Sequence, residues 1–500
     1  MDIKTAINRL NEVDNKLHAI EHAQGIIHWD AATGAPNNSI DGRAKTLSIL
    51  TGEYYKTLVN EDFNELLIFL GDNKTQLDYV TLRKVEEFRD EYDKIAKIPV
   101  ELVTEYTEVQ SKASAAWEDA KIKSDFSIFA PHLEKVIEFN KKFIEYRGYT
   151  KHPYNTLLDD YEKGLTTDDL DEFFSELKNS IVPLVAKINE SEVKINDEFI
   201  KKTYPTKEQN VLNEKLLKSL GFNMDSGMMA ESVHPFTTHF NKNDVRITTH
   251  YSENNLLSAL YSTLHEGGHA IYEQNTGDEL NYTTLGTGTS MGIHESQSRF
   301  FENIVGRSSS YIEYLYPIIK ESFPENLKDV TCEELYLAAN KSELSLIRTD
   351  ADELTYSLHI MIRYEIEKLL FENKILVTDL PEIWNKKYHE YMGLTPQNDA
   401  EGILQDVHWS EGLFGYFPSY ALGNAYASQF ANKMNETIDF AKDLKQGNLE
   451  NIREWLKEYI HKYGRLLTPS EIIEKATGEP LNAKYYTDYL EKKYSKIYNL

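Results

Sequence analysis

The residues best suited to chemistry lie close together, where His265, Glu266 and His269 form the pattern H-E-x-x-H. Residues four apart on a helix project from one face, so the two imidazoles would point the same way with the glutamate beside them. Two histidines at this spacing are typical of a zinc site in which the adjacent glutamate acts on a metal-bound water. The alternative is a surface helix that carries two solvated histidines.

The stretch around the motif favours the metal interpretation. Apolar residues recur at three- and four-residue intervals and predict a helix over residues 256–274, with Ser252 as its N-cap. Histidines in so apolar a helix need partners, because unpaired polar groups are costly to bury. Gly267 and Gly268 each cost about 1 kcal/mol relative to alanine inside a helix. We therefore expect a neighbouring element or a substrate to approach the backbone there.

A catalytic zinc usually takes three protein ligands and leaves one position open. Three residues downstream could complete the set: His294, Glu295 and Glu302. Glu295 is favoured, because a thermolysin-like site adds a glutamate from a following helix to the two histidines; the alternative is a plain ion pair with Arg299. Asn275 stands at the third histidine of the metzincin pattern, which excludes that layout. The expected cofactor is Zn²⁺, with Co²⁺ or Mn²⁺ as substitutes.

The elements that position this site are predicted to be mostly helical. Apolar stripes predict helices within residues 3–27, 77–95, 102–117 and 170–184. Residues 292–307 and 344–370 are also expected to be helical, whereas 281–290 and 401–426 predict loops. A capping-box pattern, Thr331 with Glu334, opens another helix.

One stretch breaks the helical pattern. In residues 244–251, Val245 and Ile247 alternate with polar residues, which predicts a half-buried strand. A strand just before the metal helix could add an extended peptide to its backbone edge. A short structural hairpin is the alternative.

Composition limits the possible partners. The 54 basic and 81 acidic residues give a net charge of −27, which repels nucleic acids and anionic membranes. Cys332 is the only cysteine, so no internal disulfide forms. The N-terminus lacks the apolar core of a signal peptide, and no run is long enough to span a bilayer. We expect a cytoplasmic protein without nucleic-acid or membrane partners.

Further segments carry a resemblance to a known family. In chain order they are WDAATGAP (29–36), HPF (234–236), DVRIT (244–248), HESQ (294–297), IRTDAD (347–352), GILQDVHW (402–409) and GYFPSYALGN (415–424). Together with the metal motif, this ordered set resembles the metallocarboxypeptidases of the carboxypeptidase Taq family. The resemblance implies stepwise release of C-terminal amino acids from peptides with broad specificity, generally not proline.

The resemblance also implies a fold. We expect a mostly α, single catalytic body over residues 1–500, with a helical N-terminal part at about 1–200, a zinc-site part at about 230–430 and C-terminal helices to 500. A deep groove and a small β-sheet beside the zinc helix would make it similar to neurolysin and angiotensin-converting enzyme. Homodimers are implied as well.

Carried onto this chain, the resemblance makes His265, His269 and Glu295 the metal ligands and Glu266 the catalytic carboxylate. The neurolysin-like group uses a histidine and a tyrosine from a downstream loop to stabilise the transition state. His408, with Tyr416 or Tyr420, are the matching candidates here. Core packing is the alternative for either tyrosine.

A carboxypeptidase must also recognise a free α-carboxylate, which arginine binds with a bidentate fork. Arg348 is the first candidate and Arg246 the second. A structural salt bridge is the alternative for each, Arg348 with Asp350 or Asp352, and Arg246 with Asp244. For Arg246 the salt bridge is favoured. His234 of the HPF segment is a candidate for positioning substrate or the groups around the metal.

Two other functions compete with a carboxypeptidase. An oligoendopeptidase would use the same zinc chemistry in a groove open at both ends. A catalytically silent peptide-binding protein would keep the scaffold, but it would have no use for the base Glu266.

Overall fold

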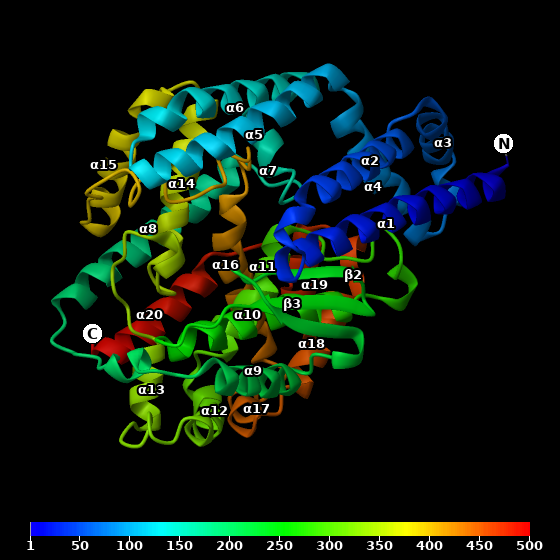
Figure 1. Ribbon diagram of the computed structural model, residues 1–500. Helices are drawn as coiled ribbons and strands as arrows, with labels where there is room; N and C mark the ends of the chain where they lie inside the picture. The colour runs from blue at the N-terminus through cyan, green and yellow to red at the C-terminus, as the bar shows by residue number, and fades with distance from the viewer. Residues whose placement is uncertain (1) are drawn as a thin grey trace.

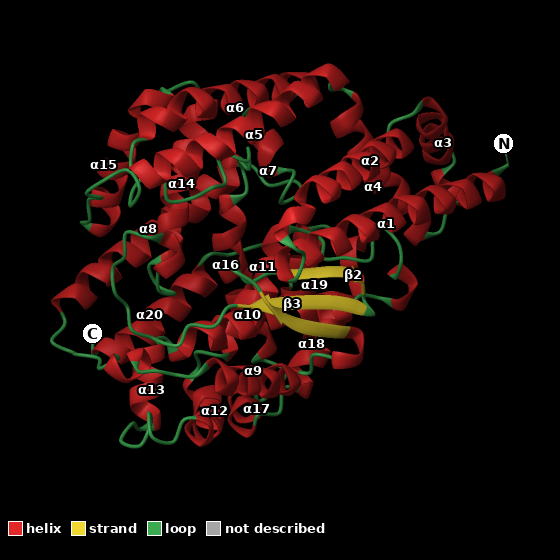
Figure 2. Cartoon of the chain, viewed as in Figure 1, coloured by secondary structure: helices red, strands yellow, loops and turns green. Residues whose placement is uncertain are grey.

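The computed structural model describes residues 2–500 and is mostly helical with one small sheet, as predicted (Figures 1 and 2). Its helices are α1 (Ile3–Thr33), α2 (Ile40–Leu58), α3 (Glu61–Asp72), α4 (Tyr79–Ala96), α5 (Val100–Lys123), α6 (Phe126–Arg147), α7 (Asn155–Leu158), α8 (Thr167–Glu190), α9 (Thr206–Leu220), α10 (Leu256–Gln274), α11 (Met291–Arg299), α12 (Ser309–Ser322), α13 (Cys332–Ala339), α14 (Tyr356–Phe371), α15 (Leu380–Met392), α16 (Phe417–Met434), α17 (Phe440–Gln446), α18 (Glu450–Tyr459), α19 (Pro469–Thr477) and α20 (Lys484–Tyr498). No helix within residues 2–500 is long and apolar enough to cross a membrane.

The hydrophobic residues form two main cores. Helices α1 to α4 pack around one of them, which includes Leu10, Leu58, Phe63 and Phe88. The larger core runs from Ala113 in α5 to residues of α20. In Figure 1 the N-terminal helices accordingly lie to one side of the main body. The expected single catalytic body and its three-part division stay predictions.

The sheet contains β1 (Gly227–Glu231), β2 (Thr237–Asn241) and β3 (Asp244–Thr249) in the order β1-β3-β2. The strand expected at 244–251 is therefore confirmed as β3, and its Val245 and Ile247 are fully buried. However, β3 is the central strand, parallel to β1 and antiparallel to β2. Both of its edges are paired, so the idea that β3 adds a peptide to its edge is wrong. The outer strand beside α10 is β2.

Helix α10 has the predicted bounds, and neighbouring elements approach its backbone closely at Gly267 and Gly268, as expected. A Cβ on Gly268 would lie 2.8 Å from Ser298 Cα of α11 and closer still to the carbonyl oxygen of Gln297. A Cβ on Gly267 would meet the end of the Leu220 side chain at 2.8 Å. The two neighbouring helices thus pack directly against the backbone of the metal helix.

The N-cap of α10 was predicted wrongly. Asn255, not Ser252, caps the helix, and its Oδ1 accepts hydrogen bonds from the backbone N–H groups of Leu257 and Ser258 at 3.1 and 3.2 Å. Asparagine and serine are both good N-caps, and Asn255 is the one directly ahead of the first helical residue.

Substituting each of the two glycines should separate their roles. We expect Gly268→Ala to lower the free energy of unfolding by about 1–3 kcal/mol, because backbone atoms of α11 cannot yield to the new methyl group. Gly267→Ala meets only flexible leucine ends and gains up to about 1 kcal/mol of helix propensity, so its stability should stay close to that of the wild type. Urea unfolding measures both, and equal losses in the two variants would contradict this account.

Two segments differ from their predicted structure. Residues 344–355 are not helical, apart from a short turn at Arg348–Asp350, and α14 begins only at Tyr356. Asp352 explains this, because its Oδ1 accepts from the backbone N–H groups of Leu354 and Thr355 and holds a turn. The loop expected at 401–426 ends at Tyr416, where α16 begins as a buried helix. The capping box of Thr331 and Glu334 is present at α13.

Candidate active site

Three side chains converge on one point at the contact of α10 and α11. Glu295 Oε2 lies 3.7 Å from His265 Nε2 and 3.5 Å from His269 Nε2. Ligand atoms that bind a tetrahedral ion at 2.0–2.1 Å lie about 3.3 Å apart. The spacing and the His/His/Glu chemistry therefore fit a divalent metal ion. Within residues 2–500, this is the one cluster of histidine, cysteine and acidic side chains arranged to hold a metal.

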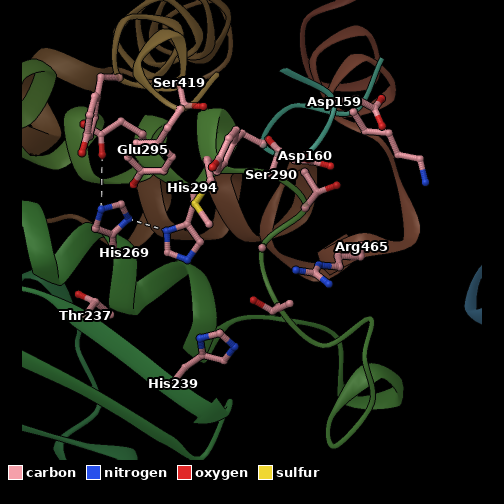
Figure 3. Close-up of a pocket in the computed structure, with 18 of the residues that line it drawn as sticks. Asp159, Asp160, Thr237, His239, His269, Ser290, His294, Glu295, Ser419 and Arg465 are labelled. Atoms are coloured by element: carbon pink, nitrogen blue, oxygen red, sulfur yellow. Dashed lines mark hydrogen bonds and ion pairs between the residues drawn. The ribbon is translucent and has the colours of Figure 1, made fainter. Parts of the chain in front are cut away.

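Glu295 is also the partner of Arg299. Arg299 Nε donates to Glu295 Oε1 at 2.7 Å, which leaves Oε2 facing the histidines. Figure 3 shows the contact between Glu295 and His269. Burial alone would raise the pKa of the Glu295 carboxyl, but the Arg299 guanidinium and the two imidazoles hold it well below its ordinary range. The ion pair and the metal-ligand position are therefore compatible. Gly423 of α16 makes room for Glu295, since a Cβ there would lie 2.7 Å from Glu295 Cβ.

The outer nitrogen of each histidine has its own partner. His265 Nδ1 lies 2.8 Å from Glu302 Oε2, on the π-helical turn that follows α11. His269 Nδ1 is hydrogen-bonded to His294 Nδ1, whose Nε2 contacts the fully buried Glu273 at 2.8 Å. Such contacts fix the ring orientation of metal-binding histidines. Both Nε2 atoms are thus turned toward Glu295.

Glu266 is held beside this triad by the sheet. Its side chain is buried, and Thr237 Oγ1 of β2 donates to Oε2 at 2.6 Å. Burial raises the pKa of the Glu266 carboxyl, while His265 and the hydrogen bond from Thr237 oppose the rise. A carboxylate with a raised pKa is suited to accept and return a proton near neutral pH.

The triad and Glu266 open into a cavity of 710 Å³. One wall comes from β2 and the segment before it, through Phe236, Thr237 and His239. Tyr416 and Tyr420 line the cavity from the start of α16, and its far end is lined by charged residues of α4 and of the segment 159–163. Two cationic side chains span this far end: Lys94 pairs with Asp159 and Asp160, and Lys163 pairs with Glu87 and Asp90.

Comparison with known proteins agrees with this geometry. The sequence profile of a family described as carboxypeptidase Taq (M32) metallopeptidase matches residues 9–494. Carboxypeptidase 1 of Bacillus subtilis is 46% identical over 501 residues, covering 100% of both chains. The chain belongs to the carboxypeptidase Taq (M32) family. It is therefore a metallocarboxypeptidase, as the resemblance implied.

Other M32 relatives share the fold over almost their whole length. Thermostable carboxypeptidase 1 of Pyrococcus furiosus is 37% identical over 483 residues, which is 96% of each chain. The M32 carboxypeptidase structure from Deinococcus radiodurans superposes with a TM-score of 0.96 at 33% identity, covering 99% of this chain and 100% of that one. Metallocarboxypeptidase 1 of Trypanosoma cruzi gives a TM-score of 0.95 at 32% identity, covering 98% and 99%.

Within this M32 site, the candidates for transition-state stabilisation lie together. Tyr416 and Tyr420 line the cavity, and His408 Nε2 lies 3.2 Å from the hydroxyl of Tyr420. His408 itself lies behind Tyr420 and is not a lining residue. Burial lowers the pKa of His408 to about 4, so the ring is neutral at neutral pH and carries a single N–H.

The arginines expected to bind substrate are engaged elsewhere. Arg348 pairs with Asp406 at 2.9 Å and donates to the hydroxyl of Tyr356 at 3.2 Å. Its guanidinium lies 5.2 Å from the ring of Tyr420, and it does not line the cavity. The suggested partners Asp350 and Asp352 were wrong: the structure pairs Arg348 with Asp406, and no local pattern connects two residues so far apart in the sequence.

The two remaining candidates lie outside the cavity. Arg246 makes two 2.8 Å hydrogen bonds to Asp244, which confirms the salt bridge that was favoured for it. His234 is exposed, and neither residue lines the cavity.

Several residues around the M32 metal site escaped sequence reasoning. Thr237 and His239 reach the cavity because they alternate on β2, a strand too short to predict. His294 was considered as a third ligand, but it contacts the candidate ligand His269 instead. Arg465 lines the cavity from a segment about 200 residues after α10 and carries no recognisable motif.

Proposed function

We propose that this M32 enzyme is a zinc-dependent carboxypeptidase that releases C-terminal amino acids with broad specificity, generally not proline. The observation that carries the proposal is the convergence of His265, His269 and Glu295 beside Glu266 in a cavity of 710 Å³. Co²⁺ or Mn²⁺ could substitute, since the donor set suits several divalent ions. We expect peptides to bind in a deep groove, similar to that of neurolysin and angiotensin-converting enzyme.

The reaction needs a proton carrier as well as a metal. A divalent ion in this site supplies Lewis acidity, which lowers the pKa of water and polarises the peptide carbonyl. Glu266 accepts the proton of the attacking water and returns it to the departing amine. The hydrogen bond from Thr237 holds the carboxylate in place, and its burial keeps competing water away.

Negative charge that develops on the carbonyl oxygen needs a fixed donor. We assign this role to Tyr420, oriented by His408, with Tyr416 as the second candidate. Support comes from their location at the cavity and from the contact between the His408 ring and the Tyr420 hydroxyl.

The peptide backbone is proposed to lie along β2. This strand pairs with β3 on one side, and Phe236, Thr237 and His239 from the same region line the cavity. An extended peptide could add to the free edge of β2 as a further strand.

For the terminal carboxylate we keep Arg348 as the proposed receptor. Its charge lies directly behind Tyr420, and Nη2 makes no hydrogen bond within residues 2–500. Arg348→Ala should raise KM at least about tenfold, because a charge-assisted pair contributes roughly 1.5–3 kcal/mol, and bound metal should not change. Arg465→Ala is the matched comparison, as a cavity arginine from another wall. A KM shift in Arg465→Ala alone would reject the role of Arg348.

One peptide, supplied as the free acid and as the C-terminal amide, tests the proposed carboxypeptidase activity. We expect the free acid to be shortened residue by residue, while the C-terminal amide resists, since the amide offers no carboxylate for the receptor. Mass spectrometry of the products gives the answer. Equal cleavage of both forms at internal bonds would favour an oligoendopeptidase, and binding without products would favour a silent peptide-binding protein.

The proposal extends to assembly and location. We propose a cytoplasmic homodimer without nucleic-acid or membrane partners, supported by the resemblance and by the net charge of −27. Light scattering on the purified protein measures the mass, and a value near 58 kDa rather than twice that would reject the dimer.

A further inference from the structure

Glu367 of α14 is a fully buried carboxylate that the proposed mechanism does not use. It accepts three hydrogen bonds. Trp409 Nε1 donates to Oε1 at 2.7 Å, the backbone N–H of Gly415 donates to Oε2 at 2.8 Å, and the hydroxyl of Tyr154 donates to Oε2 at 2.5 Å. Removing a carboxylate from water is costly unless its oxygens are hydrogen-bonded, and here the donors are Tyr154 and two residues of the segment 409–415.

Two of the donors are direct neighbours of the proposed transition-state residues. Trp409 follows His408, and Gly415 precedes Tyr416. Both ends of the segment 409–415 are therefore hydrogen-bonded to Glu367, so one carboxylate fixes both ends. The backbone of Gly415 has φ +88, and a Cβ there would lie 2.8 Å from the carbonyl carbon of Leu157. Only glycine lets this N–H reach Glu367.

The third donor, Tyr154, connects Glu367 to the opposite wall of the cavity. Tyr154 begins the segment that leads to Asp159, Asp160 and Tyr161, which line the cavity. The ring of Tyr161 meets that of Tyr416 edge-on at 5.1 Å. Glu367 is thus bonded to both segments that meet across the tyrosines.

We propose that Glu367 is a positioning residue, which sets the geometry of His408 and Tyr416 at the metal site by fixing both ends of the segment 409–415. This inference rests on the proposed function, because the proposed function gives His408 and Tyr416 their roles. A misplacement of about 1 Å in such a group can lower a rate about 10²-fold. Glu367 would therefore control turnover without contacting the substrate.

The chemistry of the donors explains why a carboxylate is needed. The indole N–H and the backbone N–H can only donate, so both require an acceptor oxygen. In Glu367→Gln one oxygen remains, and the amide NH₂ group faces an N–H that cannot turn away. One end of the segment is then released. Glu365 on the same helix offers a control, because its carboxylate bonds to Lys387 and Tyr391 of α15 and not to this segment.

The test combines kinetics with a probe of the hydrogen bond itself. The chain has five tryptophans, so ¹⁵N-indole labelling gives five N–H signals, and Trp409→Phe identifies that of Trp409. In metal-loaded Glu367→Gln we expect the Trp409 signal to move and kcat to fall about 10–100-fold, with KM within about threefold and full metal content. Glu365→Gln should match the wild type in all of these. Unchanged kcat, or a loss that merely follows metal content, would overturn the proposal.

Double variants separate positioning from a general structural role. In a His408→Ala, Tyr416→Phe background, Glu367→Gln should lower kcat much less than in the wild type, since both groups that it positions are already altered. A full additional loss would overturn the proposal. Wild-type kcat in both His408→Ala and Tyr420→Phe would reject the transition-state roles of these two residues. The Trp409 signal and the kcat of Glu367→Gln would still show whether Glu367 fixes the segment 409–415.

If Glu367→Gln does not fold, single donors can be removed. Trp409→Phe releases one end of the segment, whereas Tyr154→Phe leaves both ends bonded. We expect kcat to fall at least about tenfold in Trp409→Phe and clearly less in Tyr154→Phe. Equal values in these two variants would overturn the proposal.

Discussion

Glu266→Gln is expected to lower kcat about 10²–10⁴-fold while leaving the metal bound. The amide keeps the size of the side chain and can still accept from Thr237, so the local structure should persist. It cannot take a proton from water at neutral pH, and that is the step the variant removes. Single-turnover kinetics on a free-acid peptide, together with metal analysis of the same sample, measures both quantities.

A matched control uses a glutamate close by in the sequence. Glu253 is exposed just ahead of α10, and Glu253→Gln should retain full turnover and full metal content. If Glu266→Gln loses activity only because its metal content falls, its role as proton carrier is wrong and the carboxylate instead supports the ligands.

Asp406→Asn should cause the largest loss of stability among these variants. Asp406 lies between Arg348 at 2.9 Å and Arg363 at 2.5 Å, and Arg363 is fully buried. Removing the carboxylate leaves two guanidinium groups buried without their counter-charge. Breaking a buried pair in this way costs about 3–5 kcal/mol, which urea unfolding at pH 7 would reveal. Asp350 is exposed, and Asp350→Asn should change stability by less than about 0.5 kcal/mol.

The same site predicts a pH dependence. Burial alone would raise the pKa of the Asp406 carboxyl, but Arg363 and Arg348 hold it well below its ordinary value of 3.8. A carboxylate with a lowered pKa stabilises the folded protein above its unfolded pKa, and this stabilisation is lost as the pH falls through the folded pKa. The difference between wild type and Asp406→Asn should therefore be constant from pH 7 to about 5 and shrink below about 4. A difference independent of pH would contradict it.

Local patterns made helix α10 and the candidate metal cluster predictable. H-E-x-x-H and the apolar periodicity specify α10, because both depend on contacts within one turn or two. Gly267 and Gly268 predicted close packing against α10, since glycine inside a helix lowers its stability and packing must offset that loss. The place of Glu295 in this cluster was predictable, because a third ligand was expected from a following helix and HESQ contains a glutamate. Alternation along residues 244–251 similarly predicted β3.

Long-range contacts were not predictable in this way. Asp406 lies 58 residues after Arg348, and no local pattern joins them, so nearer acidic residues were proposed as its partner. Residues 344–355 carry helical periodicity, yet Asp352 binds backbone N–H groups and holds a turn instead. The edge position of β2 depends on strand order, which a single strand pattern does not contain. No sequence motif marks Glu367, because its proposed role depends on hydrogen bonds from Tyr154, Trp409 and Gly415, which are distant from it in the sequence.

The glycine contacts of the metal helix have a consequence for the protein without its ion. Gly268 lets α10 pack closely against the backbone of α11, and Gly423 lets α16 pack closely against Glu295, because a Cβ at either position would collide with its neighbour. The helices that carry His265, His269 and Glu295 are therefore locked in register by backbone packing rather than by the ion. Extraction of the metal should leave an empty but preformed site, and reloading should be limited by the ion's dehydration and entry, not by refolding.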